Sequence, residues 1–213
     1  MKVGTDGVLL GAAMTLRQTD RQLLDIGTGT GVISMLVACR LEEMGADWHL
    51  TAIDIDSESV EEAGLNFRES QWDCRMEARL VPLQKYDSVP DAGFDCIFSN
   101  PPFFDSSLTN PDEREKNARH NCTLSYRDIC EFAATALSTS GRLSMILPSD
   151  TERTLLKTAV SYGLYPFRLA RIKTSEKKKA ARILAEFCRD VHTGLTEEEI
   201  PVNDNEYTTK FYL

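Results

Sequence analysis

The sequence predicts an α/β protein with a mostly parallel, seven-stranded sheet and helices on both of its faces. Two observations predict this fold. Short apolar runs of the strand type alternate with longer segments in which apolar residues recur every three or four positions, and this alternation is typical of a parallel-rich sheet. The first apolar run also leads into a glycine-rich turn at residues 27–31. Ligands in such folds bind outside the carboxyl ends of the strands.

The first half of the chain supplies four strands and two helices. Residues 32–44 are apolar on nearly every face, as expected for a helix that packs on a sheet. Within residues 60–67, apolar side chains and one glycine recur at the helical period. The expected strands cover residues 22–26, 49–55, 78–81 and 94–99.

The second half adds two helices and three strands. Ser125 and Asp128 form a capping-box pattern that opens a helix with apolar residues along one face. The next helix covers residues 151–162, and Gly163 is placed to end it in the left-handed conformation. The expected strands cover residues 142–147, 167–172 and 183–188, and Gly141 and Pro148 bound the first of them.

The overall composition is that of a globular protein. Of the 213 residues, 42% are hydrophobic and 27% are charged, and we expect a single domain over residues 1–213. No apolar window is long enough to span a bilayer. The first six residues include a glycine and an acid where the apolar core of a secretory leader would begin. We therefore expect a cytoplasmic protein with no membrane partner.

The cysteines argue against a metal site. The chain has 6 of them, and no two have the C-x-x-C spacing of a zinc or redox centre. Several lie inside apolar runs, where a free thiol behaves as a small hydrophobic side chain. We expect all of them to be reduced and structural, and we expect no bound metal.

The net charge of −9 disfavours non-specific binding of nucleic acid, which depends on neutralising phosphates. Two local basic clusters remain, although such a charge run is usually a solvated face. One consists of Arg114, Lys116, Arg119 and Arg127. The other consists of Arg171, Lys173, Lys177, Lys178, Lys179 and Arg182.

A cofactor signature follows the first two expected strands. The first strand runs into Asp25-Ile26-Gly27-Thr28-Gly29-Thr30-Gly31, where glycines allow tight turns and close approach of the backbone to a ligand. A nicotinamide fingerprint would place its last glycine at Val32, and the G-K-[ST] of a phosphate-binding P-loop is absent. Asp54 ends the second strand, where a carboxylate can accept two hydrogen bonds from a ribose diol. Dinucleotide sites and S-adenosylmethionine (SAM) sites both use such an acid.

The fourth expected strand ends in Asn100-Pro101-Pro102-Phe103-Phe104. Proline fixes its own φ and restrains the residue before it. The Asn100 side chain and the Pro101 carbonyl can therefore act as two fixed acceptors that orient an amine nitrogen. Phe103 offers a flat face for a flipped base, and Phe104 either does the same or belongs to the core.

Together these patterns resemble the class I SAM-dependent methyltransferases, which have a Rossmann-like fold. The resemblance implies that SAM is the cofactor and that the glycine loop packs against its amino-acid half. It also implies that the acid after the second strand binds the ribose. The residues expected at the cofactor are Thr5, Asp6, Asp25, Gly27, Thr28, Gly29, Gly31, Asp54 and Ile55.

The N-P-P-[FYW] motif narrows the resemblance to methyltransferases that act on amino groups. Residues 1–11, 118–124, 182–187 and 206–213 further resemble segments of the tRNA1(Val) (adenine-37 N6)-methyltransferases. This implies methyl transfer to the exocyclic N6 of an adenine in tRNA. Asn100, Pro101, Pro102 and Phe103 would be the catalytic residues. Phe103, Phe104, Arg114, Lys116 and Arg119 would contact the RNA.

The chain departs from the family pattern at three places. Members carry further residues ahead of the K-V-G-T-D-G segment, so we expect a family segment to be missing here. An acid that often follows the third strand is absent, and Gln84 is a weak substitute. Lys179-Ala180 replaces a K-P pair. The alternatives are a protein glutamine-N5 or rRNA guanine-N2 methyltransferase, and a non-catalytic RNA-binding module with the same fold.

The long polar segment that follows the N-P-P-F motif, residues 105–126, predicts a lid or an RNA contact. His120 lies within it, and we expect this histidine to be structural, because the reaction needs no general base.

Overall fold

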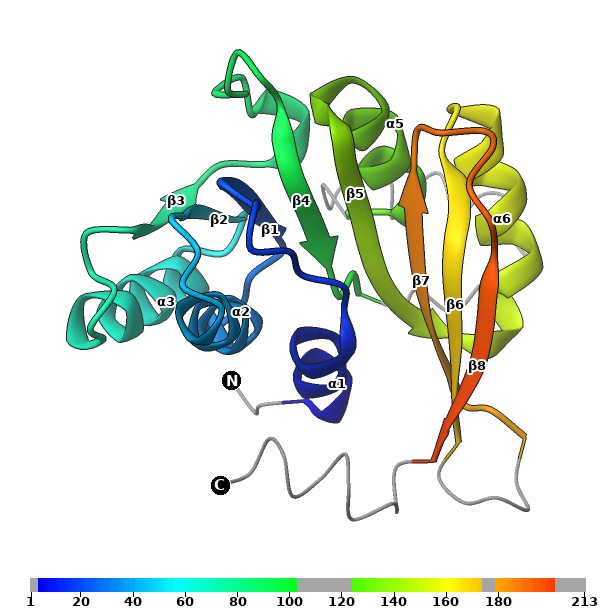
Figure 1. Ribbon diagram of the computed structural model, residues 1–213. Helices are drawn as coiled ribbons and strands as arrows, with labels where there is room; N and C mark the ends of the chain where they lie inside the picture. The colour runs from blue at the N-terminus through cyan, green and yellow to red at the C-terminus, as the bar shows by residue number, and fades with distance from the viewer. Residues whose placement is uncertain (1–3, 103–123, 174–178, 202–213) are drawn as a thin grey trace, which may run out of the picture.

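The computed structural model describes residues 4–102, 124–173 and 179–201. Their strands form one eight-stranded sheet in the order β3-β2-β1-β4-β5-β7-β6-β8, shown in Figure 1. The strands are β1 (Gln22–Ile26), β2 (His49–Asp54), β3 (Met76–Leu80), β4 (Phe94–Ser99), β5 (Leu137–Pro148), β6 (Tyr165–Lys173), β7 (Arg182–Cys188) and β8 (Thr196–Pro201). The helices are α1 (Thr5–Ala13), α2 (Val32–Glu43), α3 (Ser57–Glu69), α5 (Tyr126–Ala136) and α6 (Glu152–Ser161), with short 3-10 turns η1 (Leu83–Lys85) and η2 (Ser149–Thr151).

The sheet is mostly parallel, as predicted. Strands β1 to β5 all run in the same direction, and β7 is antiparallel to both of its neighbours. The predicted number of seven strands was wrong, because β8 pairs with β6 and extends the sheet to eight. The order of strands reverses around β1, which lies between β2 and β4. In an open α/β sheet, such a reversal is where ligands bind.

Helices cover both faces of the sheet, also as predicted (Figure 1). One apolar core lies under α1, α2 and α3 and includes Leu10, Val37 and Phe67. The second core lies under α5 and α6 and includes Ile129 and Leu155. Among the described residues, no helix is long and apolar enough to cross a membrane.

Several element ends agree with the sequence prediction. Strands β1 and β4 have the predicted bounds, and Ser125 and Asp128 form the predicted capping box. Gly163 follows α6 with a φ of 75°. Strand β5 was predicted to begin after Gly141, but it begins at Leu137, directly after α5. Helix α1 was not predicted.

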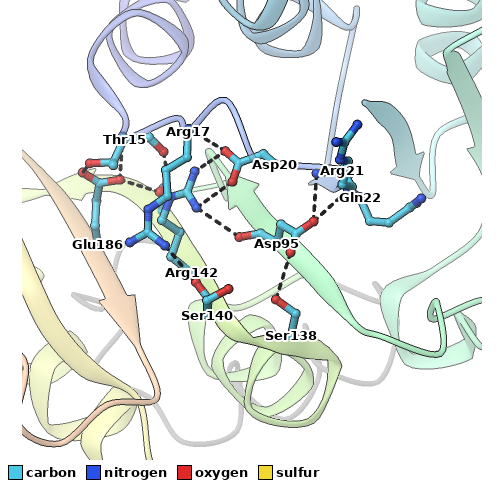
Figure 2. Close-up of polar contacts among 11 residues, drawn as sticks. Thr15, Arg17, Asp20, Arg21, Gln22, Asp95, Ser138, Ser140, Arg142 and Glu186 are labelled. Atoms are coloured by element: carbon cyan, nitrogen blue, oxygen red, sulfur yellow. Dashed lines mark hydrogen bonds and ion pairs between the residues drawn. The ribbon is translucent and has the colours of Figure 1, made fainter. Parts of the chain in front are cut away.

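A buried polar network joins the turn after α1 to the antiparallel half of the sheet (Figure 2). Arg142 on β5 forms an ion pair with Asp20, and its Nε donates to the Thr15 carbonyl at 2.8 Å. Glu186 on β7 accepts hydrogen bonds from the Thr15 backbone N–H and hydroxyl, both at 2.8 Å. Arg168 on β6 reaches the same carboxylate at 2.6 Å. Asp20, Arg142 and Glu186 are buried but compensated, which is the condition for charges to persist inside a protein.

Candidate active site

A pocket of about 500 Å³ lies at the carboxyl ends of β1, β2 and β4, beside the first turn of α1. It therefore lies where the order of strands reverses. The residues that line it are Gly4, Gly7, Ile26, Gly27, Thr28, Gly29, Thr30, Val32, Ile33, Ile53, Asp54, Ile55, Asp56, Ser59, Val81, Leu83, Gln84, Asn100, Pro102 and Leu124.

The glycine loop follows β1 along one wall of this pocket. Gly27, Gly29 and Gly31 have φ values of 72°, 57° and 80°, which residues with a side chain rarely adopt. Gly27 and Thr28 donate their backbone N–H groups to the Ile53 carbonyl at 2.9 and 3.1 Å. The loop is therefore bonded to β2 and holds its backbone against the pocket.

Gly31 was predicted to lie at the cofactor, and the structure shows a packing contact for it. It does not line the pocket. A Cβ atom at this position would lie 2.6 Å from Phe67 Cε1 on α3, which is closer than carbon atoms can pack. Gly31 therefore allows the start of α2 to approach α3, and this packing role could not be read from the motif.

Asp25 lies beneath the loop and not in the pocket lining. Its Oδ2 accepts hydrogen bonds from the Thr28 hydroxyl at 2.8 Å and from the Ser34 hydroxyl at 2.6 Å. Its Oδ1 is buried and has no partner among the described residues. Burial, assisted by the negative charge of Asp54, raises the pKa of Asp25 from 3.8 to about 6. Asp25 thus holds the glycine loop in shape through these hydrogen bonds, from a position outside the pocket lining.

Asp54 lines the pocket at the end of β2 and has one backbone donor on each oxygen. Gly29 N–H donates to Oδ2 at 2.9 Å, and Asp56 N–H donates to Oδ1 at 3.0 Å. A carboxylate offers about four acceptor positions, so each oxygen retains capacity for one hydroxyl of a ribose diol. This geometry fits binding of the ribose hydroxyls, the role that the sequence predicts for Asp54.

The end of the pocket beyond Asp54 is mainly apolar. Ile53, Ile55, Val81 and Leu83 line it together with Gln84. Apolar walls of this kind can hold a flat adenine ring between them. Among the described residues, no acid after β3 contributes to the lining, and Gln84 occupies that part of the wall.

Asn100 stands at the edge where β1 and β4 end side by side. Ile26 pairs with Ser99, and the Ser99 hydroxyl donates to the Ile26 carbonyl at 2.7 Å. This pairing places Asn100 next to the glycine loop. Its Oδ1 is buried without a hydrogen-bond partner among the described residues. An unpaired buried acceptor costs free energy, and a donor brought by a ligand would remove that cost.

The rest of the N-P-P-F motif is only partly described. Pro101 is buried, and Pro102 is exposed and lines the pocket. Phe103, Phe104 and His120 lie outside the described residues, as do Arg114, Lys116 and Arg119 of the first basic cluster. Arg127, the remaining member of that cluster, is exposed in the first turn of α5.

In the opening segment, Gly4 and Gly7 line the pocket, whereas Thr5 and Asp6 do not. Asp6 instead accepts a hydrogen bond from Arg182 Nε at 2.8 Å. The lining residues that the sequence did not single out include Gly4, Gly7 and Leu124. The first two could have been found only by recognising α1 as a helix that reaches the pocket.

In the second basic cluster, three cations are already paired with carboxylates. Arg171 contacts Glu152 at 2.6 Å and Glu197 at 2.7 Å, and Lys173 contacts Glu199 at 2.5 Å. Arg182 is paired with Asp6. These carboxylates compete with phosphate for the cations. Within the described ranges, no group of three or more His, Cys, Asp or Glu residues could hold a metal ion.

The chain matches known methyltransferases over most of its length. Residues 4–161 match the family "Methyltransferase small domain". A tRNA1(Val) (adenine(37)-N6)-methyltransferase from Bacteroides fragilis is 34% identical, and the match covers 100% of this chain and 91% of that protein. A protein of the same name from Phocaeicola vulgatus is 38% identical over 88% of this chain and 76% of its own length.

Solved structures have the same fold at low sequence identity. A predicted O-methyltransferase from Agrobacterium tumefaciens superimposes with a TM-score of 0.69 at 18% identity, covering 93% of this chain and 87% of its own. Geranyl diphosphate C-methyltransferase from Streptomyces coelicolor, solved with S-adenosyl-L-homocysteine, gives a TM-score of 0.59 at 12% identity, covering 87% and 79%. These structures establish the Rossmann-like methyltransferase fold.

Proposed function

The chain belongs to the methyltransferase small domain family and, within it, to the tRNA1(Val) (adenine(37)-N6)-methyltransferases, and from this we propose that it transfers a methyl group from SAM to the N6 amine of an adenine in tRNA. Adenine-37 of tRNA1(Val) is the proposed position. The observation that carries the chemistry is the Oδ1 of Asn100, which is buried at the edge of the pocket without a hydrogen-bond partner among the described residues.

The pocket residues fit SAM at each of its parts. The glycine loop would hold the amino-acid half, Asp54 would accept the ribose hydroxyls, and the apolar wall that includes Ile55, Val81 and Leu83 would hold the adenine. SAM supplies an electrophilic methyl group when it is bound. The chain's own contribution is then to bring a poor nucleophile to that methyl group in the right orientation.

Asn100 and Pro101 provide this orientation. The lone pair of an adenine amine is delocalised into the ring, which makes the nitrogen a weak nucleophile. Two fixed acceptors, Asn100 Oδ1 and the Pro101 carbonyl, take one N–H each and favour a more pyramidal nitrogen with an available lone pair. The acceptors are set before the substrate arrives, so the stabilisation needs no reorganisation during the reaction.

Three further parts of the proposal concern the domain organisation, the cellular location and the residues that bind the RNA. We propose that residues 1–213 act as a single domain, and the one continuous sheet that runs through all the described ranges supports this. The protein acts in the cytoplasm, where tRNA is modified. The RNA is bound by the first basic cluster, since in the second Arg171, Lys173 and Arg182 are paired with carboxylates.

The test is incubation of the protein with labelled SAM and, separately, total tRNA, rRNA or a peptide release factor. Label is expected in tRNA, as N6-methyladenosine after digestion. Label in rRNA or in the release factor would replace the proposal by guanine-N2 or glutamine-N5 transfer. SAM binding with no labelled product from any substrate would identify a non-catalytic module.

Two variants test the role of Asn100. Asn100→Ala removes the acceptor and is expected to lower kcat on tRNA by at least about 100-fold, as for loss of one preorganised hydrogen-bonding group, with SAM affinity near wild type. Asn100→Asp retains an acceptor oxygen and is expected to keep measurable turnover. Full turnover by the alanine variant would show that Asn100 only shapes the turn.

A further inference from the structure

Helix α1 forms part of the pocket wall, although its sequence favours a helix only weakly. Gly4 and Gly7 line the pocket, and Gly7 and Gly11 let α1 approach α2. A Cβ at Gly7 would lie 3.3 Å from Ile33 Cγ1, and one at Gly11 would lie 3.0 Å from Leu36 Cβ. The helix has nine residues, no side-chain N-cap and no basic residue in its own last turn. Helices shorter than about 12 residues are marginal alone, so other segments must hold α1 in place.

Three arginines from distant elements bind the carbonyl groups at the end of α1. Arg40 donates to the Gly11 carbonyl at 2.7 Å, and Arg168 donates to the Ala13 carbonyl at 2.6 Å. Arg142 donates to the Thr15 carbonyl just beyond (Figure 2). Cations at this end of a helix satisfy its last carbonyl groups and complement its dipole. The end of α1 farther from the pocket is thus firmly attached.

The end of α1 nearer the pocket is held by Asp6 and Arg182. Asp6 lies in the first turn, next to the pocket residue Gly7, and accepts from Arg182 Nε at 2.8 Å. Arg182 itself belongs to the sheet. It is the first residue of β7 and pairs with Pro148 on β5 and Ile172 on β6. A residue fixed by two neighbouring strands is therefore in direct contact with the part of α1 that faces the cofactor.

We propose that Arg182 is a positioning residue for cofactor binding: by holding Asp6, it fixes the first turn of α1 as a wall of the SAM pocket. The proposal rests on SAM as the cofactor and not on the identity of the methyl acceptor. It also gives Asp6 an indirect part in binding. The side chain acts by placing the backbone of Gly4 and Gly7.

The first test is calorimetric titration of SAM into the RNA-free protein. Arg182→Gln and Asp6→Asn are each expected to raise the Kd of SAM about threefold to fivefold, because a partly exposed ion pair contributes modestly. The double variant is expected to be no worse than either single variant. Additive effects in the double variant would mean that Arg182 acts through another partner, and would overturn the proposal.

Arg171→Gln is the matched control. Arg171 lies on the neighbouring strand β6 and is also paired with two carboxylates, Glu152 and Glu197, but not with α1. Its loss is expected to leave the Kd of SAM unchanged. An equal rise in Kd for both arginine variants would indicate general destabilisation and would also overturn the proposal.

A second measurement needs neither SAM nor RNA. Hydrogen exchange of the backbone amides in α1 is expected to be faster in Arg182→Gln than in wild type, whereas exchange in α5 is expected to be unchanged. Unchanged exchange in α1 would contradict the proposal even if SAM binding were weakened.

In steady state with tRNA, Arg182→Gln should raise KM for SAM with kcat nearly unaltered.

Discussion

Arg142 and Asp20 form an ion pair in the interior of the protein, where their side chains are 1% and 2% exposed. The two residues are far apart in the sequence, and the pair holds the turn after α1 against β5 (Figure 2). Removing one partner of such a pair leaves an uncompensated buried charge, which is more costly than the pair itself is stabilising.

Asp20→Ala is therefore expected to lower the free energy of unfolding by about 3–5 kcal/mol, measured by urea denaturation. Asp47→Ala is the comparison, because Asp47 pairs with Arg21 at the surface, where the two side chains are 82% and 55% exposed. That change is expected to cost less than about 1 kcal/mol. Similar losses of unfolding free energy in the two variants would mean that the buried Arg142–Asp20 pair matters no more for stability than the surface pair.

Gly31→Ala tests the packing of the glycine loop against α3. The new methyl group would enter both a left-handed backbone position and the space of Phe67, so the expected loss of stability is about 2–4 kcal/mol. Gly163 has a similar φ of 75°, but apart from Gly163 itself and its two chain neighbours no described residue has an atom within 4 Å of the place that its Cβ would take. Gly163→Ala is expected to cost about 1–2 kcal/mol, the conformational cost alone. Equal losses would exclude the steric contribution of Phe67.

Asp54→Ala is expected to weaken SAM binding by about 1–3 kcal/mol, or roughly fivefold to 150-fold, because charge-assisted hydrogen bonds to the ribose are lost. Calorimetry measures the change. Asp73→Ala, at an exposed position outside the pocket lining, is expected to bind SAM normally. Unchanged affinity in Asp54→Ala would remove this residue from the ribose site.

Asp25 should make stability depend on pH. Its pKa is raised from 3.8 to about 6 in the folded protein, so between these values the folded state binds more protons than the unfolded state. Stability then falls as the pH rises through this window and is constant above it. Asp25→Asn lacks the titrating group, so the stability of wild type relative to this variant should fall from pH 4 to pH 6. Urea denaturation across this range measures it, and a flat or rising difference would show that the pKa is not raised.

The elements that could be predicted are those whose ends are marked by the sequence itself. The glycine turn ends β1, the prolines end β4, and the capping box of Ser125 and Asp128 begins α5. Asp54 and Asn100 could be placed for the same reason, since each directly ends or follows a recognisable strand.

The elements that could not be predicted depend on residues far away in the chain. Helix α1 contains two glycines and is held by Arg40, Arg168 and Arg182. Strand β8 contains three consecutive glutamates, residues 197–199, which indicate a solvated segment. It pairs with β6 and buries Ile200, and its three glutamates lie beside cations of β6. No local pattern contains that information.

The attachment of α1 also has a consequence for the order of events during synthesis. A ribosome makes residues 5–13 well before two of the arginines that hold them, which are at positions 168 and 182. While the middle of the chain is being made, the helix can rest on α2, and Arg142 on β5 can hold the turn that follows it, but the contact between Asp6 and Arg182 cannot form. The cofactor pocket therefore gains its last wall only after β7 has left the ribosomal tunnel, so a nascent chain that already contains the glycine loop, Asp54 and Asn100 still lacks the pocket that they serve.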